Sequence, residues 1–137
     1  MKGRKRHIIV AVCGHLLAVT VPSAGLQDFH GARLALAKLA QREWVRLEKI
    51  LADAIYKGDR YWADWIRETF GWEIEVVERK PGTKGFQVVP KRWVVERTFA
   101  WLGRNRRLSK DYELLPETSE TWIYIAMTAL LTRRLAS

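Results

Sequence analysis

Cysteine and long apolar runs are scarce in this sequence. Its 137 residues include one cysteine, Cys13, which excludes a disulfide framework and a zinc finger. We expect Cys13 to fill space in the core. The late apolar run 123–131 is too short to cross a bilayer, and no secretory signal is visible. These absences predict a cytoplasmic protein without a membrane partner.

Acidic residues are also in deficit, because 24 Lys and Arg face 15 Asp and Glu, a net charge of +9. This balance favours a polyanionic partner, and nucleic acid is the first candidate. A merely basic soluble protein is the alternative. The apolar share of 48% excludes a disordered tail, and the length suits one domain, residues 1–137, with a modest core.

Hydrophobic periodicity predicts strands that alternate with helices, and therefore an α/β sheet covered by helices. Gly14 and His15 separate two β-rich runs, which predicts antiparallel strands joined by a tight turn. We expect Asp28 to cap the first helix, Pro116 to break the chain, and Thr118 or Ser119 to cap the last helix. The predicted strands are 8–13, 16–21, 46–53 (buried at Ile50-Leu51-Ala52) and 72–77, and the predicted helices are 28–40, 61–70, 91–110 and 119–135.

The helix predicted over 91–110 is strongly basic. It holds seven Lys and Arg residues and a single acid, Glu96. Val95, Phe99 and Leu102 repeat at helical spacing and are expected to face a core, with Val94, Thr98 and Trp101 beside them. We predict that its basic side chains contact DNA phosphates: Arg92, Arg97, Arg104, Arg106, Arg107 and Lys110.

A lone carboxylate on a basic helix has two interpretations. Glu96 follows Arg92 by four residues, which is typical of a surface ion pair. Alternatively, Glu96 binds a metal ion beside bound phosphates, which requires a second acid. Asp53 is the candidate, because it closes a predicted strand and functional groups collect at the carboxyl ends of strands in open α/β sheets. Asp53 could equally be a helix or turn cap.

Together, Asp53 and Glu96 point to Mg²⁺ or Mn²⁺, which prefer oxygen ligands and also accept phosphate oxygens. A pair of such ions activates a water or a 3′-hydroxyl and stabilises the leaving oxygen. The sequence therefore predicts a catalytic and metal-binding site for phosphoryl transfer on DNA, formed by these two acids.

These residues carry a resemblance to a known family. The segment 93–102 (WVVERTFAWL), followed by 106–113 (RRLSKDYE), closely resembles the C-terminal region of bacterial insertion-sequence transposases with the DDE triad. The segments 2–7 (KGRKRH), 27–28 (QD), 52–53 (AD) and 56–58 (YKG) look like the same family and occur in its order. The resemblance runs nearly end to end.

The resemblance implies a ribonuclease-H-like domain, a mixed sheet flanked by helices, that cuts and joins DNA at element ends. The second acid of the triad then matches Asp53, the third matches Glu96, and an arginine four residues before the third matches Arg92. The family's first acid lies on a central first strand upstream of the basic lead-in, where this chain begins. We expect that strand to be missing, which leaves an unpaired gap in the sheet.

We therefore expect a truncated or frameshifted transposase that binds double-stranded DNA, at element ends and target, without cutting it. The family's Asp after the Ile-Ile-Val run is Ala11 here, and glycines after the second acid are Ala54 and Ile55. Two other interpretations stay open. The chain could be a non-catalytic basic module for RNA or DNA. It could also self-associate, or complete the catalytic domain of another chain such as an upstream-frame fragment.

Overall fold

Strands and helices alternate along the chain, as the hydrophobic pattern predicts. The structure, a computed structural model, describes residues 4–53, 60–77, 92–108 and 112–136. The chain divides into two compact units. The terminal unit joins residues 1–41 to residues 94–137, and the middle unit is residues 42–93.

A β-hairpin organises the terminal unit. Strands β1 (His7–Val10) and β2 (Leu16–Thr20) pair antiparallel, as predicted. The turn is tight because the Ala11 N–H donates to the His15 carbonyl at 2.8 Å and Gly14 has a φ of 91°. Cys13 lies exposed in this turn, so the predicted core role for it is wrong.

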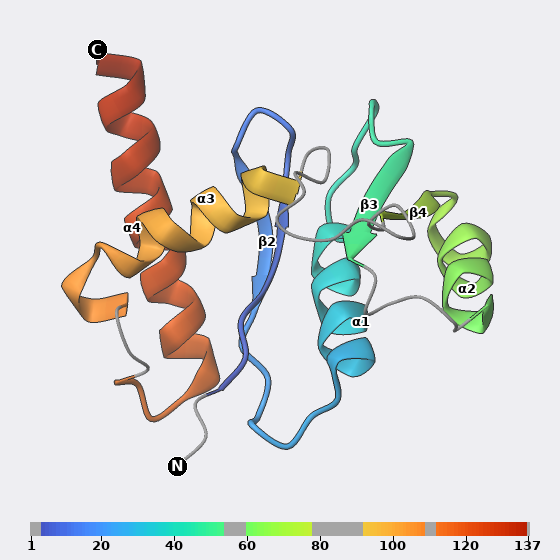
Figure 1. Cartoon of the computed structure of the whole chain (residues 1–137), viewed down its shortest axis with the longest axis horizontal. Coiled ribbons are helices and arrows are strands. Elements are labelled where there is room, and N and C mark those ends of the chain that lie inside the picture. Colours follow the sequence, from blue (N-terminus) through green and yellow to red (C-terminus); the bar gives the residue numbers. More distant parts are fainter. Residues whose placement is uncertain (1–3, 54–59, 78–91, 109–111, 137) are drawn as a thin grey trace, which may run out of the picture. The chain divides into compact units, whose positions relative to one another are not determined.

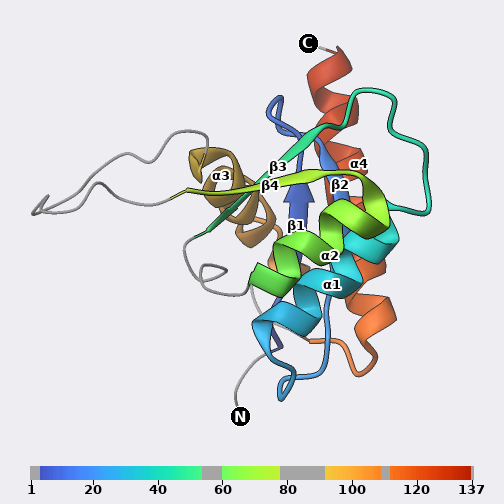
Figure 2. The ribbon, with the colours of Figure 1, turned by 90° about the vertical axis from the view of Figure 1, so that its right-hand side faces the viewer.

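Helices cover both faces of this hairpin. Figures 1 and 2 show β1 and β2 between α1 (Asp28–Leu39) on one side and α4 (Pro116–Ala136) on the other, with α3 (Arg92–Gly103) crossing α4. One apolar cluster fills the space between β2, α3 and α4 and the 3₁₀ helix η2 (Arg106–Leu108). Its buried members are Val19, Val21, Leu102, Leu108, Ile123 and Met127.

Both predicted helix caps in this unit are wrong, the first by one residue and the second because α4 begins before Thr118 and Ser119. Gln27 holds the N-cap position of α1, so Asp28 is the first helical residue and its carboxylate pairs with Lys5 at 2.7 Å. Pro116 begins α4 instead of breaking the chain, because proline has no N–H to lose in a first turn. Ser119 then lies inside the helix and is buried.

Helix α3 is shorter and rotated relative to the prediction. It ends at Gly103, and η2 follows after a turn. Val94, Thr98 and Leu102 form its buried ridge, whereas Val95 and Phe99 are 37% and 38% exposed. The predicted burial of Val94, Thr98 and Leu102 is therefore confirmed, whereas that of Val95 and Phe99 is wrong. The buried Thr98 hydroxyl donates to the Val94 carbonyl at 2.9 Å, which satisfies its polar group inside the helix.

The middle unit is a single strand–helix–strand segment. Strand β3 (Lys49–Asp53) pairs in parallel with β4 (Glu73–Val77), and α2 (Arg60–Phe70) connects them and packs on β4. Trp62 and Ile66 are buried on α2, and Gly71 ends the helix with a φ of 74°. These features agree with the helix predicted over 61–70.

One prediction for the middle unit is wrong. Strand β3 is not buried, because Leu51 is 38% exposed. β3 has a hydrogen-bonded neighbour only in β4, within the described part of the chain, and the four described strands form two separate two-stranded sheets. The mixed α/β class is therefore confirmed. No helix of the described residues is long and apolar enough to span a bilayer.

Candidate nucleic-acid interface

Helix α3 presents the predicted third acid to solvent. Its buried ridge of Val94, Thr98 and Leu102 fixes the rotation of the helix against the core. Glu96, Ala100 and Gly103 consequently lie on exposed positions. An exposed carboxylate beside small neighbours is accessible to a large ligand.

The predicted second acid ends a strand. Asp53 is the last residue of β3 and is opposite Val77 in the parallel ladder. Its side chain, like that of Arg92, is outside what the structure describes. Asp53 belongs to the middle unit and Glu96 to the terminal unit, so their convergence stays a prediction. Within the described ranges, no three His, Cys, Asp or Glu side chains gather as metal ligands.

Arg97 is partly buried against aromatic surface. Its guanidinium lies 4.4 Å from the centre of the Trp101 ring, and the Arg134 guanidinium lies 5.6 Å from the same ring. Both guanidinium groups also approach Gly14 in the hairpin turn. These cation–π contacts hold two positive charges where α3, α4 and the turn meet. Arg134 was not predicted from the sequence. The available signal was the pair Arg133 and Arg134 in the last turn of the last helix.

Two arginines extend into solvent just after α3. Arg104 and Arg106 are exposed, on either side of Asn105. The Asn105 side-chain oxygen accepts the Arg107 N–H at 3.1 Å, which fixes the start of η2. Because the guanidinium group is planar and always charged, it can bind a phosphate through two parallel hydrogen bonds. This short segment therefore has the chemistry of a phosphate contact.

Arg107 is also exposed, and the structure shows its partners within the protein. Its Nε donates to Glu113 Oε1 at 2.7 Å, and its guanidinium lies 4.8 Å from the centre of the Trp122 ring. Nearby, Arg6 donates to the Leu108 carbonyl at 2.9 Å. Arg107 therefore connects η2 to α4, in addition to any phosphate contact. Lys110, the last predicted contact, lies outside the described residues.

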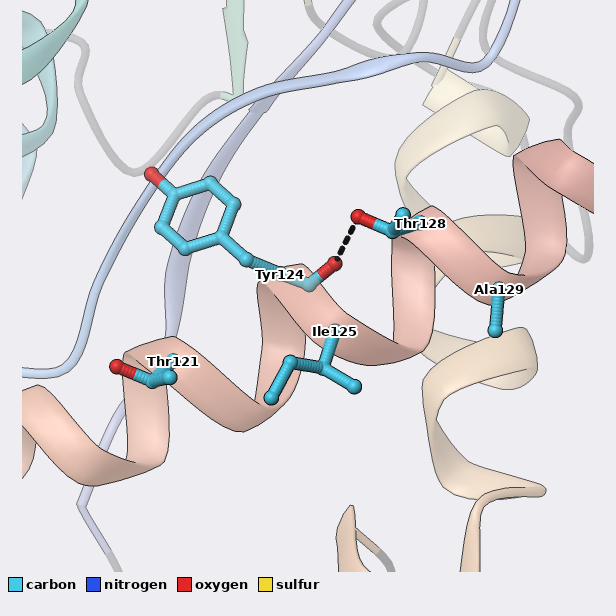
Figure 3. Close-up of a pocket in the computed structure, with 5 residues that line it drawn as sticks. All are labelled: Thr121, Tyr124, Ile125, Thr128 and Ala129. Carbon is cyan, nitrogen blue, oxygen red and sulfur yellow. Dashed lines mark hydrogen bonds between the residues drawn. The ribbon is translucent and has the colours of Figure 1, made fainter.

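A shallow hollow on α4 is chemically different. Figure 3 shows its lining side chains on one stretch of the helix, with the Tyr124 ring extending toward the hairpin. The Thr128 hydroxyl donates to the Tyr124 carbonyl at 2.8 Å, so its methyl group and Ile125 leave the surface largely apolar. No acid or base lines it: the five lining residues are Thr121, Tyr124, Ile125, Thr128 and Ala129. The hollow cannot bind a metal ion or a phosphate by charge.

One histidine in the terminal unit is electrostatically perturbed. Burial lowers the pKa of His7, against the nearby Asp28 carboxylate, which raises it. The ring packs against Gly31 of α1. In the middle unit, a hydrogen bond from Lys49 to Glu75 at 3.0 Å raises the lysine pKa on an exposed face. Neither group lies beside the arginines after α3 in sequence.

Comparison with models of protein families gives a match that spans most of the chain. Residues 1–131 match the family model described as Transposase DDE domain. The match spans both segments of the terminal unit, the middle unit and both predicted acids. No curated protein and no solved structure matches the chain significantly.

Proposed function

Because this chain belongs to the Transposase DDE domain family, we propose that it binds double-stranded DNA at the ends of an insertion element and at its target. The observation that supports this most is the exposed pair Arg104 and Arg106 after α3. The family is one of DNA transposition, and its members generally use divalent metal ions.

Electrostatics supplies the binding free energy in this proposal. Each guanidinium that neutralises a phosphate releases condensed counterions, and this release favours binding at low salt. The net charge of +9 gives the whole chain the same preference. Such contacts do not read base sequence, so we expect duplexes of different sequence to bind with similar affinity.

The proposal also assigns metal binding to two acids, Asp53 and Glu96. Asp53 and Glu96 are oxygen donors of the type that Mg²⁺ and Mn²⁺ prefer, and when bound such an ion stabilises charge on phosphate oxygens. Among the described residues, no three His, Cys, Asp or Glu side chains are grouped so that they could hold a metal ion. Two carboxylates hold a divalent ion less firmly than three, so we propose that the 137-residue chain alone binds DNA without cutting it.

The binding test is fluorescence anisotropy with a labelled duplex of element-end sequence and a scrambled duplex, at several salt concentrations. We expect a steep fall in affinity with salt for both duplexes. Arg104→Ala should weaken binding to both alike and reduce the salt slope by about one. Arg104→Lys is the matched control, because it keeps the charge. A flat salt response contradicts the proposal.

The cleavage test uses the same duplexes with Mn²⁺. We expect no nicking by the chain. Efficient nicking that is lost in Glu96→Gln would overturn the non-cutting part of the proposal while supporting the assignment of Glu96. Unchanged DNA binding in the same variant would show that the two parts are separate.

A non-catalytic basic RNA- or DNA-binding module is the second candidate. It is favoured by the position of Glu96 on the exposed face of a basic helix, where an acid four residues after Arg92 suits a surface ion pair. Measurement of Mn²⁺ binding separates the two. Binding that disappears in Asp53→Ala supports the metal-binding proposal, and absence of any binding supports the module.

A further inference from the structure

Loop 112–115, which leads into α4, is held against the terminal unit by its polar groups. The Glu113 carboxylate accepts a hydrogen bond from Arg107 Nε at 2.7 Å. From the start of the chain, Arg4 donates to the Glu113 carbonyl and, at 3.3 Å, to the Leu114 carbonyl. The backbone of the loop is therefore fixed by contacts with residues on both sides of it in the sequence.

The large apolar side chains of the same loop are exposed. Tyr112, Leu114 and Leu115 are 60%, 93% and 57% exposed. Single exposed apolar side chains are ordinary on a protein surface, but three within four residues form a patch, and exposed apolar patches mark binding sites. Burial of this surface against a ligand is favourable because it removes apolar area from water. A loop that bonds its polar groups within the protein and exposes its apolar ones is therefore suited to bind an apolar surface.

The charges beside the loop indicate which kind of partner fits. Arg107 bonds to the carboxylate of the loop itself and follows the exposed Arg104 and Arg106, so three guanidinium groups accompany one bonded carboxylate. Glu117 lies in the first turn of α4, which disfavours a phosphate at that helix end and favours one on the arginine side. Unstacked nucleic-acid bases offer flat apolar faces next to phosphates, and aromatic side chains beside positive charge bind them in this way.

A second copy of the chain fits the same patch less well. A symmetric contact between two copies brings the same surface of each into register. Arg104 and Arg106 of both copies would then lie close together, and their like charges would repel. The charge beside the patch therefore favours a polyanion over another copy of this basic chain.

We propose that loop 112–115 binds an unpaired, unstacked base of the DNA whose phosphates contact Arg104 and Arg106. The Tyr112 ring stacks on the face of the base, and Leu114 fills the space that the base leaves between its neighbours, as apolar wedges do in distorted duplexes. The inference rests on the proposed DNA binding and adds to it a preference for DNA in which a base is unpaired.

The test compares two labelled duplexes of the same sequence, one fully paired and one with a single unpaired thymine, by fluorescence anisotropy with the full chain. We expect the unpaired thymine to raise affinity roughly tenfold, as stacking of one base on an aromatic ring does. In Tyr112→Ala, shown to be folded by circular dichroism, the ratio of the two affinities should fall to about one. Tyr112→Phe is the matched control, because it keeps the ring and should keep the ratio. Arg104→Ala should weaken binding to both duplexes and also keep the ratio.

A second measurement uses the unchanged chain. With 5-iodouracil in place of the unpaired thymine, irradiation should crosslink the base to Tyr112, and crosslinks only to other residues would overturn the inference.

Three further outcomes would overturn it. Equal affinity of the unchanged chain for both duplexes, with a steep salt dependence retained, would refute the base contact and leave the proposed DNA binding intact, whereas a flat salt response would contradict the DNA binding itself. A ratio that persists in Tyr112→Ala would show that the greater flexibility of the unpaired duplex causes the preference. Self-association without DNA that disappears in Leu114→Glu would identify a second copy as the partner of the loop.

Discussion

The terminal unit and the middle unit differ in how far apart their contacting residues lie in the chain. In the terminal unit, Glu120 bonds to Val21 across 99 residues. In the middle unit, Lys49 bonds to Glu75 across 26. Loop closure costs entropy before distant contacts can form, so the terminal unit depends on both ends of the chain, whereas the middle unit is local. The arginines proposed to bind DNA, Arg104 and Arg106, belong to this long-range unit.

The largest expected effects come from removing the core of either unit. Ile123 of the terminal unit and Ile66 of the middle unit are each 0% exposed. Ile123→Ala and Ile66→Ala should each lower the free energy of unfolding by about 2–5 kcal/mol, since each leaves a cavity. Hydrogen exchange should accelerate mainly in the unit that carries the substitution. Equal acceleration in both units would show that the division has no energetic meaning.

The next-largest effect tests the long-range contacts of Glu120 with Val21 and Lys38. Glu120→Ala removes the acceptor of the Val21 N–H and the carboxylate partner of Lys38, which keeps its hydrogen bond to the Val19 carbonyl. It should lower the unfolding free energy by about 1.5–3 kcal/mol. Glu120→Gln keeps an acceptor for the Val21 N–H and should cost less. Urea unfolding measures both. If the two variants are equally stable, the hydrogen bond from the Val21 N–H contributes nothing, and Glu120 stabilises the protein only through its ion pair with Lys38.

Two glycines sharpen the comparison further. A methyl group at Gly31 would overlap the His7 ring, so Gly31→Ala should lower the free energy of unfolding by about 1–3 kcal/mol, and by less in a His7→Ala background.

Gly71 has open space around it and a φ of 74°. Gly71→Ala should therefore cost about 1 kcal/mol, with Gly71→Asn milder, because only the backbone conformation is strained. Thermal unfolding of the set is the measurement, and a full cost for Gly31→Ala without the His7 ring would refute the packing explanation.

The smallest expected effect depends on pH. Burial lowers the pKa of His7 below 6.5, so the unfolded chain binds a proton more readily than the folded one. This contribution to stability is present above about pH 6.5 and is lost as pH falls through the lower folded pKa. Unfolding free energies at pH 7.5 and pH 5 should differ less in His7→Gln than in the unchanged chain. The exposed His15 supplies the control, and an identical change in His15→Gln would contradict the assignment.

The hydrophobic pattern was sufficient to predict the elements whose contacts lie close together in the chain. Hydrophobic periodicity predicted the strand 72–77 and the helix 61–70, which the structure shows as β4 and α2. The hairpin was predicted from its turn residues. Patterns were insufficient for α3, where the predicted burial of Thr98 is confirmed but Val95 and Phe99 are 37% and 38% exposed, because helical spacing alone does not fix which of two neighbouring apolar ridges packs against the core.

The sequence by itself determined the order of the elements, the basic character of the segment after α3, and the membership of the transposase family. Only the tertiary structure decided how each arginine is placed, with Arg104 and Arg106 exposed and Arg107 bonded to Glu113. It alone revealed that side chains of α1 and α4 hydrogen-bond to the backbone of Val19 and Val21. The physical reason is that Tyr124, Glu120 and Lys38 reach β2 from elsewhere in the chain, and no local pattern encodes contacts between residues so far apart.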